Sequence, residues 1–546
     1  MKKAFLLCVV FIALFFSCTY SQSFQWAVHG GCNSGDYGNS IAVDAQGNSF
    51  VTGWYQNTAT FGTVNLTSAG GYDIFIIKYD NSGQVVWAQS AGGINNDIGY
   101  GIDLDANGNI YVAGAFTGTA MFGTAISVTS VNNSSDIFVA RYDMNGNPVW
   151  VQQAGSTTDD QAQAIAVDKA AAKIYVSGYF KNNCSFGSLS VTSSGQSDIF
   201  IAKYDTLAAV NSTPMWVQKG GGAGYDIPYG VSIDAAGSVY VTGVFTGNAN
   251  FDGMPAISAG GDDIFLAKYN SSGIIQWVHR DGGTQGDKGL AVAASGTDIY
   301  YTGWFSGSAT IGSTNLTGAG LDEIFIAKID AAGNSQWADK AGGTGYDQGY
   351  GICTDGAGNV YATGSYDSVA TFGTTTLTSA GSWDVFIAKY SASGIFQWVM
   401  SGGSPASNTF ERDIGYSIKA DTSHNLYATG IIRNTASFGS NSITSNGIQD
   451  VFVTKISLLT SAATDASKNE IIIYPDPVHD FLFIRNNFSP YKILHAEIYN
   501  TLGKKVFDKN VSAVPNRIDV SNLVNGIYFI RVQDGNVLRV AKFVRN

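Results

Sequence analysis

Residues 100–116, YGIDLDANGNIYVAGAF, and residues 136–154, DIFVARYDMNGNPVWVQQA, decide the fold of this chain. Each stretch contains two runs rich in β-branched and aromatic residues, joined by a short Asp-Asn-Gly turn. That is the pattern of a β-hairpin, because Asn and Gly adopt the positive φ that tight turns require. A connector of about 20 residues joins the two hairpins. The segment therefore predicts four antiparallel strands.

Three markers show that this segment recurs with a mean period of about 62 residues. They are a tryptophan in the fourth strand, an acidic residue at the start of the third strand, and an aspartate in the loop before the first strand. Seven copies of four short strands predict a seven-bladed β-propeller in an all-β chain. A linear solenoid is the alternative, and it requires capping repeats that the sequence does not show. The tryptophans are Trp26, Trp87, Trp150, Trp216, Trp277, Trp337 and Trp398. The loop aspartates are Asp36, Asp97, Asp160, Asp226, Asp287, Asp347 and Asp413. The third-strand acids are Asp73, Asp136, Asp198, Asp263, Glu323, Asp384 and Asp450.

The two ends of the repeat region complement each other. It begins with a lone fourth strand around Trp26 and ends with a lone third strand, DVFVTKI, at residues 450–456. We therefore expect the first strand to complete the last blade, which closes the ring and removes free sheet edges.

The N-terminus has the composition of a targeting segment. Lys2 and Lys3 precede 13 apolar residues at 4–16, and small and polar residues follow. This predicts a signal peptide at residues 1–22, cut near Ser21 or Gln22. A lipoprotein anchored at Cys18 is the alternative. Since no other long apolar run exists, we expect no transmembrane segment in the mature chain.

Charge and cysteine content exclude several classes of protein. The chain has 546 residues and a net charge of −12, with 17 basic and 34 acidic residues between positions 24 and 464. An acidic surface disfavours nucleic-acid binding, which needs a basic footprint. Cys32, Cys184 and Cys353 show no metal-ligand or disulfide spacing, so we expect them to be buried apolar residues.

The repeats resemble the seven-bladed propeller repeats of secreted bacterial proteins. The resemblance is carried by DIFIAKYD at residues 198–205, by the tryptophan that follows, and by GNSFVTGWY at residues 47–55. It covers roughly residues 24–457 of a predicted propeller domain at residues 23–459, and it implies the fold without an activity.

Composition changes after this region. Residues 460–469 read as a polar linker, and residues 470–546 predict a small antiparallel β-sandwich. That segment resembles the type IX secretion C-terminal sorting domain through YPDPVHDFLFI (474–484), IDVSNLVNGIYFIRV (518–532) and the terminal KFV. The resemblance implies export through the type IX machinery to the outer surface or surroundings of a Gram-negative bacterium. The motif residues are Tyr474, Pro475, Pro477, Gly503, Gly526, Tyr528 and Lys542.

The sequence offers no catalytic constellation. No HExxH, GxSxG or P-loop motif occurs, so we assign no catalytic residue, cofactor or metal site. The seven loop aspartates recur in every copy, which favours a structural role in bonding loop amides. Asp103, Asp105, Asn107 and Gly108 begin like a calcium loop, but Gly114 stands where the bidentate Glu belongs, so a hairpin turn is the better interpretation. Calcium elsewhere is left open because the protein is acidic and exported.

Binding is the favoured function. Strand order places the fourth-to-first and second-to-third connections on one side of the ring, which we call the loop face. Aromatic residues that break the repeat there are candidate ligand contacts: Tyr72, Trp383, Tyr225 and Tyr346. Trp54 and Trp304 lie within second strands and are expected in the core. We predict a non-catalytic binding or adhesion module for an extracellular glycan or protein. The alternatives are a polysaccharide-degrading enzyme that uses loop-face aspartates and a purely structural surface protein.

Overall fold

The computed structural model describes residues 21–207, 212–405, 412–459, 472–485, 493–501, 503–512, 517–534 and 537–546. Nearly all regular structure among them is β-strand, and the helical exception in these ranges is the short η1 (Val131–Asn133). The prediction of an all-β chain is therefore confirmed. The chain divides into two compact units, Gln22–Leu458 and a second one that includes the residues from Leu459 on. The predicted signal peptide lies outside the described residues, apart from its last two positions.

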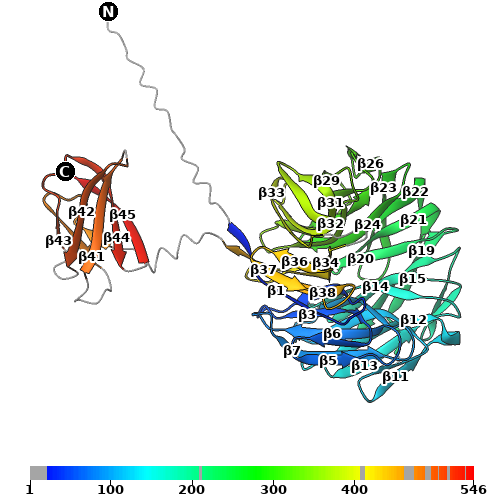
Figure 1. Cartoon of the computed structure of the whole chain (residues 1–546). Helices are drawn as coiled ribbons and strands as arrows, with labels where there is room; N and C mark the ends of the chain where they lie inside the picture. Colours follow the sequence, from blue (N-terminus) through cyan, green and yellow to red (C-terminus); the bar gives the residue numbers. More distant parts are fainter. Residues whose placement is uncertain are drawn as a thin grey trace, which may run out of the picture. The chain divides into compact units, whose positions relative to one another are not determined.

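The larger unit contains seven groups of four antiparallel strands, which we call repeats 1 to 7, and connector strands join some of these groups into larger sheets (Figure 1). In repeats 1 to 6 the four strands pair in chain order, and in repeat 7 the fourth place is taken by a strand from the start of the chain. In each repeat the first and fourth strands therefore lie at opposite sides. Repeat 1 consists of β2 (Tyr37–Val43), β3 (Ser49–Tyr55), β6 (Asp73–Tyr79) and β7 (Val85–Gly92), and repeat 2 of β8 (Ile98–Leu104), β9 (Ile110–Thr117), β12 (Ser135–Tyr142) and β13 (Pro148–Ala154). Repeat 3 consists of β14 (Gln161–Asp168), β15 (Lys173–Phe180), β18 (Asp198–Asp205) and β19 (Trp216–Gly222), and repeat 4 of β20 (Ile227–Ile233), β21 (Val239–Phe251), β22 (Met254–Tyr269) and β23 (Ile275–Gly283). Repeat 5 consists of β24 (Asp287–Ser295), β25 (Asp298–Phe305), β28 (Glu323–Asp330) and β29 (Ser335–Gly343), and repeat 6 of β30 (Gln348–Thr354), β31 (Val360–Phe372), β32 (Thr375–Tyr390) and β33 (Phe396–Gly403). Repeat 7 consists of β34 (Ile414–Ala420), β35 (Leu426–Ile432), β38 (Asp450–Leu459) and β1 (Ser21–Gly31).

The seven first strands lie next to one another in a closed cycle. Each packs against the first strand of the next repeat, from β2 through β8, β14, β20, β24 and β30 to β34, and β34 packs against β2. The first strands thus surround a central axis, and the fourth strands lie farthest from it.

Strand β1 supplies the fourth strand of repeat 7, although it precedes all the others in sequence. It lies between β38 and the connector strand β4 of repeat 1, and Figure 1 shows the blue β1 beside β38. The hydroxyl of Thr454 donates to the carbonyl of Trp26 at 2.8 Å, and His29 Nδ1 lies 3.1 Å from Asp450 Oδ2. The two ends of the repeat region are therefore joined by a shared sheet.

The long connectors between second and third strands contain an additional hairpin that the sequence analysis missed. In each repeat a strand of this hairpin meets the fourth strand of the preceding repeat, as Phe122 of β10 meets Ala91 of β7. The available signal was the repeated Phe-Gly or Ile-Gly step, as in Phe122-Gly123, which forms the turn of this hairpin. In repeats 4 and 6 the second and third strands, β21 with β22 and β31 with β32, extend continuously to form this connector hairpin. In the other repeats the connector strands are separate: β4 (Thr58–Phe61), β5 (Val64–Thr67), β10 (Thr119–Phe122), β11 (Ile126–Thr129), β16 (Asn183–Phe186), β17 (Leu189–Thr192), β26 (Ser308–Ile311), β27 (Thr314–Thr317), β36 (Thr435–Phe438) and β37 (Asn441–Thr444).

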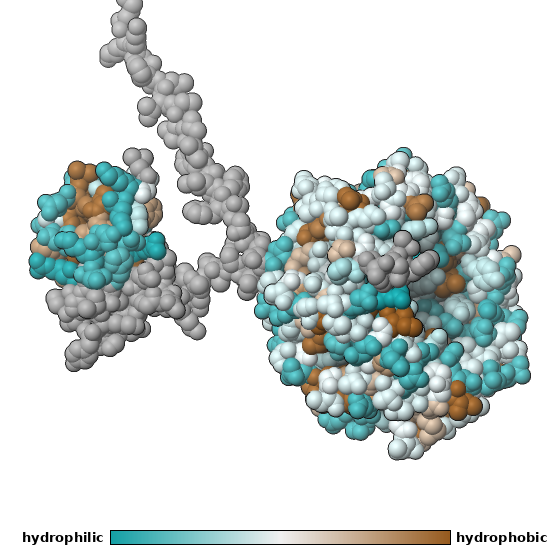
Figure 2. Space-filling view, in the orientation of Figure 1, coloured by the Kyte–Doolittle hydropathy of each residue, from teal (hydrophilic) through white to brown (hydrophobic). Residues whose placement is uncertain are grey.

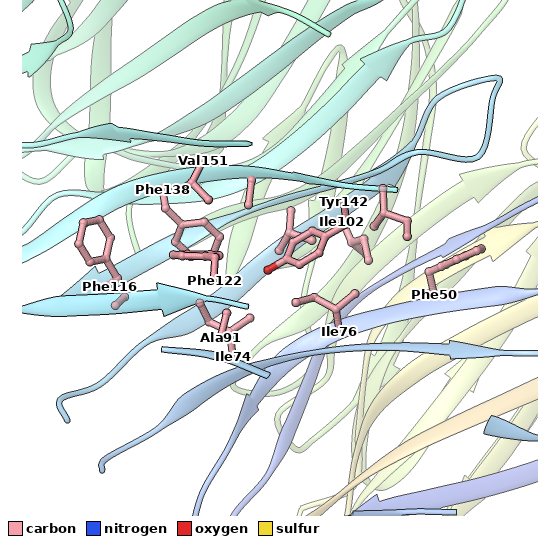
Figure 3. Close-up of a cluster of buried hydrophobic side chains, with 14 of the residues drawn as sticks. Phe50, Ile74, Ile76, Ala91, Ile102, Phe116, Phe122, Phe138, Tyr142 and Val151 are labelled. Atoms are coloured by element: carbon pink, nitrogen blue, oxygen red, sulfur yellow. The ribbon is translucent and has the colours of Figure 1, made fainter. Parts of the chain in front are cut away.

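The hydrophobic core is divided among the spaces between neighbouring repeats. Figure 3 shows one such cluster, in which Phe50 and Ile76 of repeat 1 face Ile102, Phe138 and Tyr142 of repeat 2. Corresponding clusters fill the other six spaces, including the one between repeats 7 and 1. Each β-sheet is therefore buried on both faces, which explains why second and third strands read as continuous apolar runs.

The repeated tryptophans and basic residues connect each repeat to the next. Trp216 Nε1 and Lys203 Nζ both donate to the carbonyl of Ser271, at 3.3 and 2.7 Å, across the boundary between repeats 3 and 4. Trp277 with Lys268 and Trp337 with Lys328 do the same at the next two boundaries. These side chains are inter-repeat contacts, and none of these lysines pairs with the acid that begins its own strand.

The smaller unit contains two antiparallel sheets around one apolar core. The residues buried in it include Leu482, Ile498, Tyr528 and Phe543. The three-stranded sheet consists of β39 (Ile472–Tyr474), β40 (Phe481–Arg485) and β43 (Arg517–Asp519). The four-stranded sheet consists, in spatial order, of β42 (Lys505–Ser512), β41 (Ile493–Asn500), β44 (Gly526–Asp534) and β45 (Val537–Arg545).

Candidate functional site

The seven loop aspartates are buried, and each binds two backbone amides. Asp97 Oδ2 accepts the N–H of Gly93 at 2.7 Å, and its Oδ1 accepts the N–H of Thr117 at 3.0 Å. The carboxylate thus links the end of one repeat's fourth strand to the connector of the next repeat. The other six make the corresponding pair of bonds, and none of the seven is more than 1% exposed. This geometry suits a structural role, and it leaves these seven carboxylates without access to a substrate.

Each loop aspartate lies near the third-strand acid of the preceding repeat. Asp73 Oδ2 accepts the N–H of Ala69 at 2.8 Å, while its buried Oδ1 has no partner among the described residues. Burial raises the pKa of Asp97 to about 7, its amide bonds oppose that shift, and the charge of Asp73 adds to it. Burial likewise raises the pKa of Asp73 to about 6. These two carboxyls therefore keep their protons to a higher pH than an ordinary aspartate does.

The D-x-D-x-N-G stretch forms a hairpin turn in the structure. Asp105 Oδ1 accepts the N–H groups of Asn107 and Asn109, at 2.8 and 2.9 Å, and its Oδ2 accepts the Asn109 amide and the Tyr111 hydroxyl. Asp103 turns away from this loop and accepts the N–H of Val167 in the next repeat. Both carboxylates are already occupied by donors, so the turn interpretation fits the geometry better than a calcium loop.

The mouth of the central axis is lined by aromatic and amide side chains. The third residue after each loop aspartate faces this opening, which holds a cavity of about 340 Å³. That volume lies within the roughly 300–1,000 Å³ typical of small-molecule sites. The residues of this ring are Asn39, Tyr100, Gln163, Tyr229, Leu290, Tyr350 and Tyr416.

One sector of the loop face carries a continuous row of aromatic rings, which we call the aromatic row. Tyr72 contacts Trp54 at 4.2 Å between ring centroids, and Trp54 stacks on Tyr37 at 4.4 Å with an angle of 15°. Tyr37 lies 6.3 Å from Tyr416, which in turn meets Tyr350 edge-on at 5.3 Å. The row crosses repeats 1, 7 and 6 and ends in Tyr416 and Tyr350, which line the mouth of the central axis.

A cationic residue lies beside the aromatic row. The guanidinium carbon of Arg412 sits 4.1 Å from the ring centre of Trp383, which packs in the same cluster as Tyr37, Tyr350 and Tyr416. Burial raises the pKa of Tyr350 and Tyr416, and the charge of Arg412 opposes this effect at both. The sector therefore combines aromatic rings, phenol hydroxyls and positive charge.

The four predicted ligand contacts fall into two groups. Tyr72 belongs to the aromatic row, and Tyr346 lies beside it, 5.8 Å from Trp383. Tyr225 is 53% exposed in repeat 4, and no other ring contacts it in the part of the chain that the structure describes. Trp383 was expected to present an open ring, but Arg412 covers it and leaves it 7% exposed.

The expectation that Trp54 and Trp304 lie in the core is wrong. Both side chains are only partly buried, and each ring lies beside the glycine that directly precedes a loop aspartate, Gly35 for Trp54 and Gly286 for Trp304. Trp54 joins the aromatic row, and Trp304 lies under the ammonium of Lys288 at 5.6 Å.

Sequence reasoning also missed Tyr37, Tyr350, Tyr416 and Arg412. For Tyr350 and Tyr416 the available signal was positional, because the third residue after each loop aspartate is Tyr in four repeats. Tyr37 instead directly follows its loop aspartate, Asp36. Arg412 directly precedes the loop aspartate Asp413, where no other repeat has a basic residue.

The smaller unit contains a cluster with potential metal ligands, His495, Glu497 and Asp508. Lys505 contacts both carboxylates, with Glu497 Oε1 at 3.1 Å, and Arg531 lies 3.4 Å from Glu497. The positive charges that a metal ion would supply are thus already present, so the cluster is an ion-pair network.

The sorting-motif residues occupy turns and packing positions of the smaller unit. Tyr528 is 4% exposed, stacks on Phe543 and donates to the carbonyl of Val524 at 2.8 Å. Gly503 adopts a φ of +75° in the turn before β42, which favours glycine. Tyr474, Pro475 and Pro477 lie at the end of β39 and just after it, Gly526 begins β44, and Lys542 is exposed on β45.

Comparison with known proteins gives distant relatives for the larger part of the chain. It is 24% identical to an uncharacterized WD repeat-containing protein of Acanthamoeba polyphaga mimivirus, over 69% of this chain and 34% of that protein. It is 28% identical to the regulatory protein FlaEY of Caulobacter vibrioides, over 29% of this chain and 16% of that protein. The chain thus spans about a third of the length of the first relative and about a sixth of the length of the second.

The similar solved structures align with low TM-scores. The extracellular domain of a putative one-component system from B. thetaiotaomicron aligns with a TM-score of 0.24 and 11% identity, over 93% of this chain and 79% of that one. A DUF4221 family member from Bacteroides vulgatus aligns with a TM-score of 0.27 and 10% identity, over 80% and 98% of the two chains.

The C-terminal comparison is specific. Residues 472–546 match the family model described as secretion system C-terminal sorting domain. The prediction of a sorting domain is confirmed, and it implies an interaction with the type IX secretion machinery. Within the part of the chain that the structure describes, no helix has the length and apolarity needed to cross a bilayer. The chain therefore carries a secretion system C-terminal sorting domain and is a secreted or cell-surface protein.

Proposed function

We propose that this protein is a non-catalytic binding module of the cell surface or its surroundings, built as a seven-bladed β-propeller that binds an extracellular glycan. Residues 23–459 form the propeller. The signal peptide at residues 1–22 starts export, and residues 470–546 direct the type IX step that follows. The ligand site is the aromatic row, Tyr72, Trp54, Tyr37, Tyr416 and Tyr350.

The propeller assignment rests on two observations. The seven first strands pack in a closed cycle, and β1 pairs with β38 to complete repeat 7. A solenoid has two open ends and requires capping repeats. Since repeat 7 packs against repeat 1 through a shared hydrophobic cluster, the closed arrangement is favoured.

The aromatic row is the observation that carries the binding function. Tyrosine and tryptophan faces bury the C–H surfaces of sugars, and their polar edges retain hydrogen bonds to hydroxyls. Five aromatic side chains from three separate repeats converge here. The packing of a single repeat does not require such a cluster. The adjoining cavity of about 340 Å³ gives the row a recessed end.

The enzymatic alternative is weakened by the burial of the loop aspartates. A glycosidase requires two carboxyl groups that reach the scissile bond. All seven loop aspartates accept two backbone amides each and are at most 1% exposed. A hydrolytic site at these seven positions would require the loops to unfold.

The test is a glycan-binding screen with the purified full chain, with and without calcium, followed by variants. We expect selective binding without product release. Trp54→Ala should weaken it about tenfold, or about 1.4 kcal/mol, since Trp54 contacts two other rings of the row. Tyr225→Ala is the matched control, because this exposed tyrosine lies outside the row. Equal losses in both variants, or binding to no glycan, would contradict the proposed site; retained affinity for an extracellular protein would then favour a protein ligand.

A further inference from the structure

Arg412 differs from other cations of the larger unit in its surroundings. Arg280 lies 3.7 Å from Asp263, and Arg141 donates to the carbonyl of Thr206 at 3.3 Å. For Arg412, no carboxylate lies within ion-pair distance among the residues that the structure describes. Arg141 also has no carboxylate within that distance among the described residues, so what distinguishes Arg412 is its position: its guanidinium carbon lies over Trp383, which packs with Tyr37, Tyr350 and Tyr416.

Contact with Trp383 restricts this guanidinium. Its carbon atom lies 4.1 Å from the Trp383 ring centre, where a cation is attracted to the indole face. The backbone of Arg412 is also held, because it forms a β-bridge with Trp383, and the N–H of Asp413 donates to the Trp383 carbonyl at 2.9 Å. Arg412 is thus positioned before any ligand arrives, which reduces the entropy cost of binding.

The positive charge acts on the same surface as the aromatic row. It opposes the burial-induced rise in the pKa of Tyr37, as it does for Tyr350 and Tyr416. Arg433 acts in the same direction on Tyr37. Three phenol groups from repeats 1, 6 and 7 therefore share the nearby charge of Arg412, and a ligand that lies along the row meets aromatic side chains and a guanidinium.

We infer that the aromatic row selects glycans that carry carboxylate groups, with sugar units along the accessible parts of the row and a uronate carboxylate paired with the Arg412 guanidinium. This inference rests on the proposed glycan-binding function and names its ligand class. The fork of N–H groups matches a carboxylate in two parallel hydrogen bonds. The acidic surroundings disfavour densely charged polyanions, so isolated uronate units in a largely neutral chain suit the site best.

Lys288 provides a matched control on the same face. Its ammonium lies over Trp304 at 5.6 Å, which parallels Arg412 over Trp383. Lys288 also lies 3.8 Å from Asp262, so its charge already has an acidic partner. Removing this charge should leave uronate binding unchanged.

The experiment is calorimetric binding of the full chain to glucuronate-, galacturonate- and mannuronate-containing oligosaccharides, each beside its carboxyl-reduced neutral counterpart. We expect at least one uronate oligosaccharide to bind about tenfold tighter than its reduced form. Arg412→Gln should abolish that preference, Arg412→Lys should retain part of it, and Lys288→Gln should leave it intact. Thermal unfolding of each variant identifies any loss that comes from misfolding.

The outcomes separate this inference from the proposed function. Equal affinity for uronate and reduced forms, unchanged in Arg412→Gln, would overturn the ligand class and leave glycan binding in place. Binding of neutral glycans outside this set, with no uronate bound, would do the same. Failure to bind any glycan would overturn both.

Discussion

Asp73 and Asp97 face each other across Gly92. A Cβ atom built on Gly92 would lie 2.7 Å from Oδ1 of Asp73 and 2.8 Å from Oδ2 of Asp97. The same arrangement recurs at Gly31, Gly221, Gly282 and Gly342, each between a third-strand acid and a loop aspartate. The glycine in the fourth strand thus makes room for two buried carboxyl groups, and this pairing joins adjacent repeats.

The carboxyl pairs predict that acidification from neutral pH stabilises the fold. Burial raises the pKa of Asp36 and Asp226 to about 6 and of Asp287 and Asp347 to about 7, against 3.8 for an ordinary aspartate. Between about pH 4 and 7 the folded state therefore binds more protons than the unfolded state, and the free energy of unfolding falls as pH rises. We expect it to be higher at pH 5 than at pH 7.5 by on the order of a few kcal/mol.

Thermal or denaturant unfolding at the two pH values measures this difference. Asp97→Asn removes one titrating group and should reduce the pH dependence. A midpoint that rises from pH 5 to 7.5 would show that these carboxyls are ionised in the folded protein.

Substituting Gly92 tests the close approach directly. Gly92→Ala should destabilise the larger unit by about 3 kcal/mol or more, because the methyl group would meet both carboxyl groups and because the φ of +147° disfavours a side chain. Gly356→Ala is the control, since nothing lies within 4 Å of a Cβ there. Similar unfolding midpoints for the two variants would show that the carboxyls move apart at little cost.

Removing the Asp97 carboxylate should expose its role as an amide acceptor. Asp97→Ala leaves the N–H groups of Gly93 and Thr117 without their acceptor. A buried amide without a partner costs about 1–3 kcal/mol, so we expect a loss of about 2–5 kcal/mol in unfolding free energy. Asp80→Ala, in an exposed turn, should cost less. Equal effects would mean that Asp97 does not anchor the loop.

The closing strand predicts a strong effect of a short N-terminal truncation. Deleting residues 23–30 removes most of β1 and leaves β38 and the connector strand β4 without their neighbour. It also removes the contacts of Trp26 with the Asn81 carbonyl and of His29 with Asp450. We expect loss of cooperative unfolding or aggregation, followed by circular dichroism and size-exclusion chromatography. A monomeric protein with an unchanged melting curve would contradict closure through β1.

The four main strands of each repeat, the repeat itself and the sorting domain follow from the amino-acid sequence alone. Runs of β-branched and aromatic residues and Asp-x-Asn-Gly turns act locally, so residues 100–116 and 136–154 define their hairpins without reference to the rest of the chain. Repetition also separated structural residues from candidate contacts, because a residue such as Asp97 that recurs in each repeat serves a need common to all. The sorting domain was recognised from a contiguous segment, whose motif positions are close in sequence.

Which of the non-repeated residues lie close together depends on how the repeats pack against one another. Tyr37, Trp54 and Tyr72 lie in one repeat, but Tyr416 and Arg412 are more than 330 positions away and reach them because repeat 7 packs against repeat 1. The same packing buried Trp383 beneath Arg412 and left Tyr225 apart from the row. Side-chain direction at a strand end, which no periodicity encodes, placed Trp54 on the loop face instead of in the core. The binding surface depends on contacts between repeats, and those distances are set by packing of the sheets rather than by spacing along the chain.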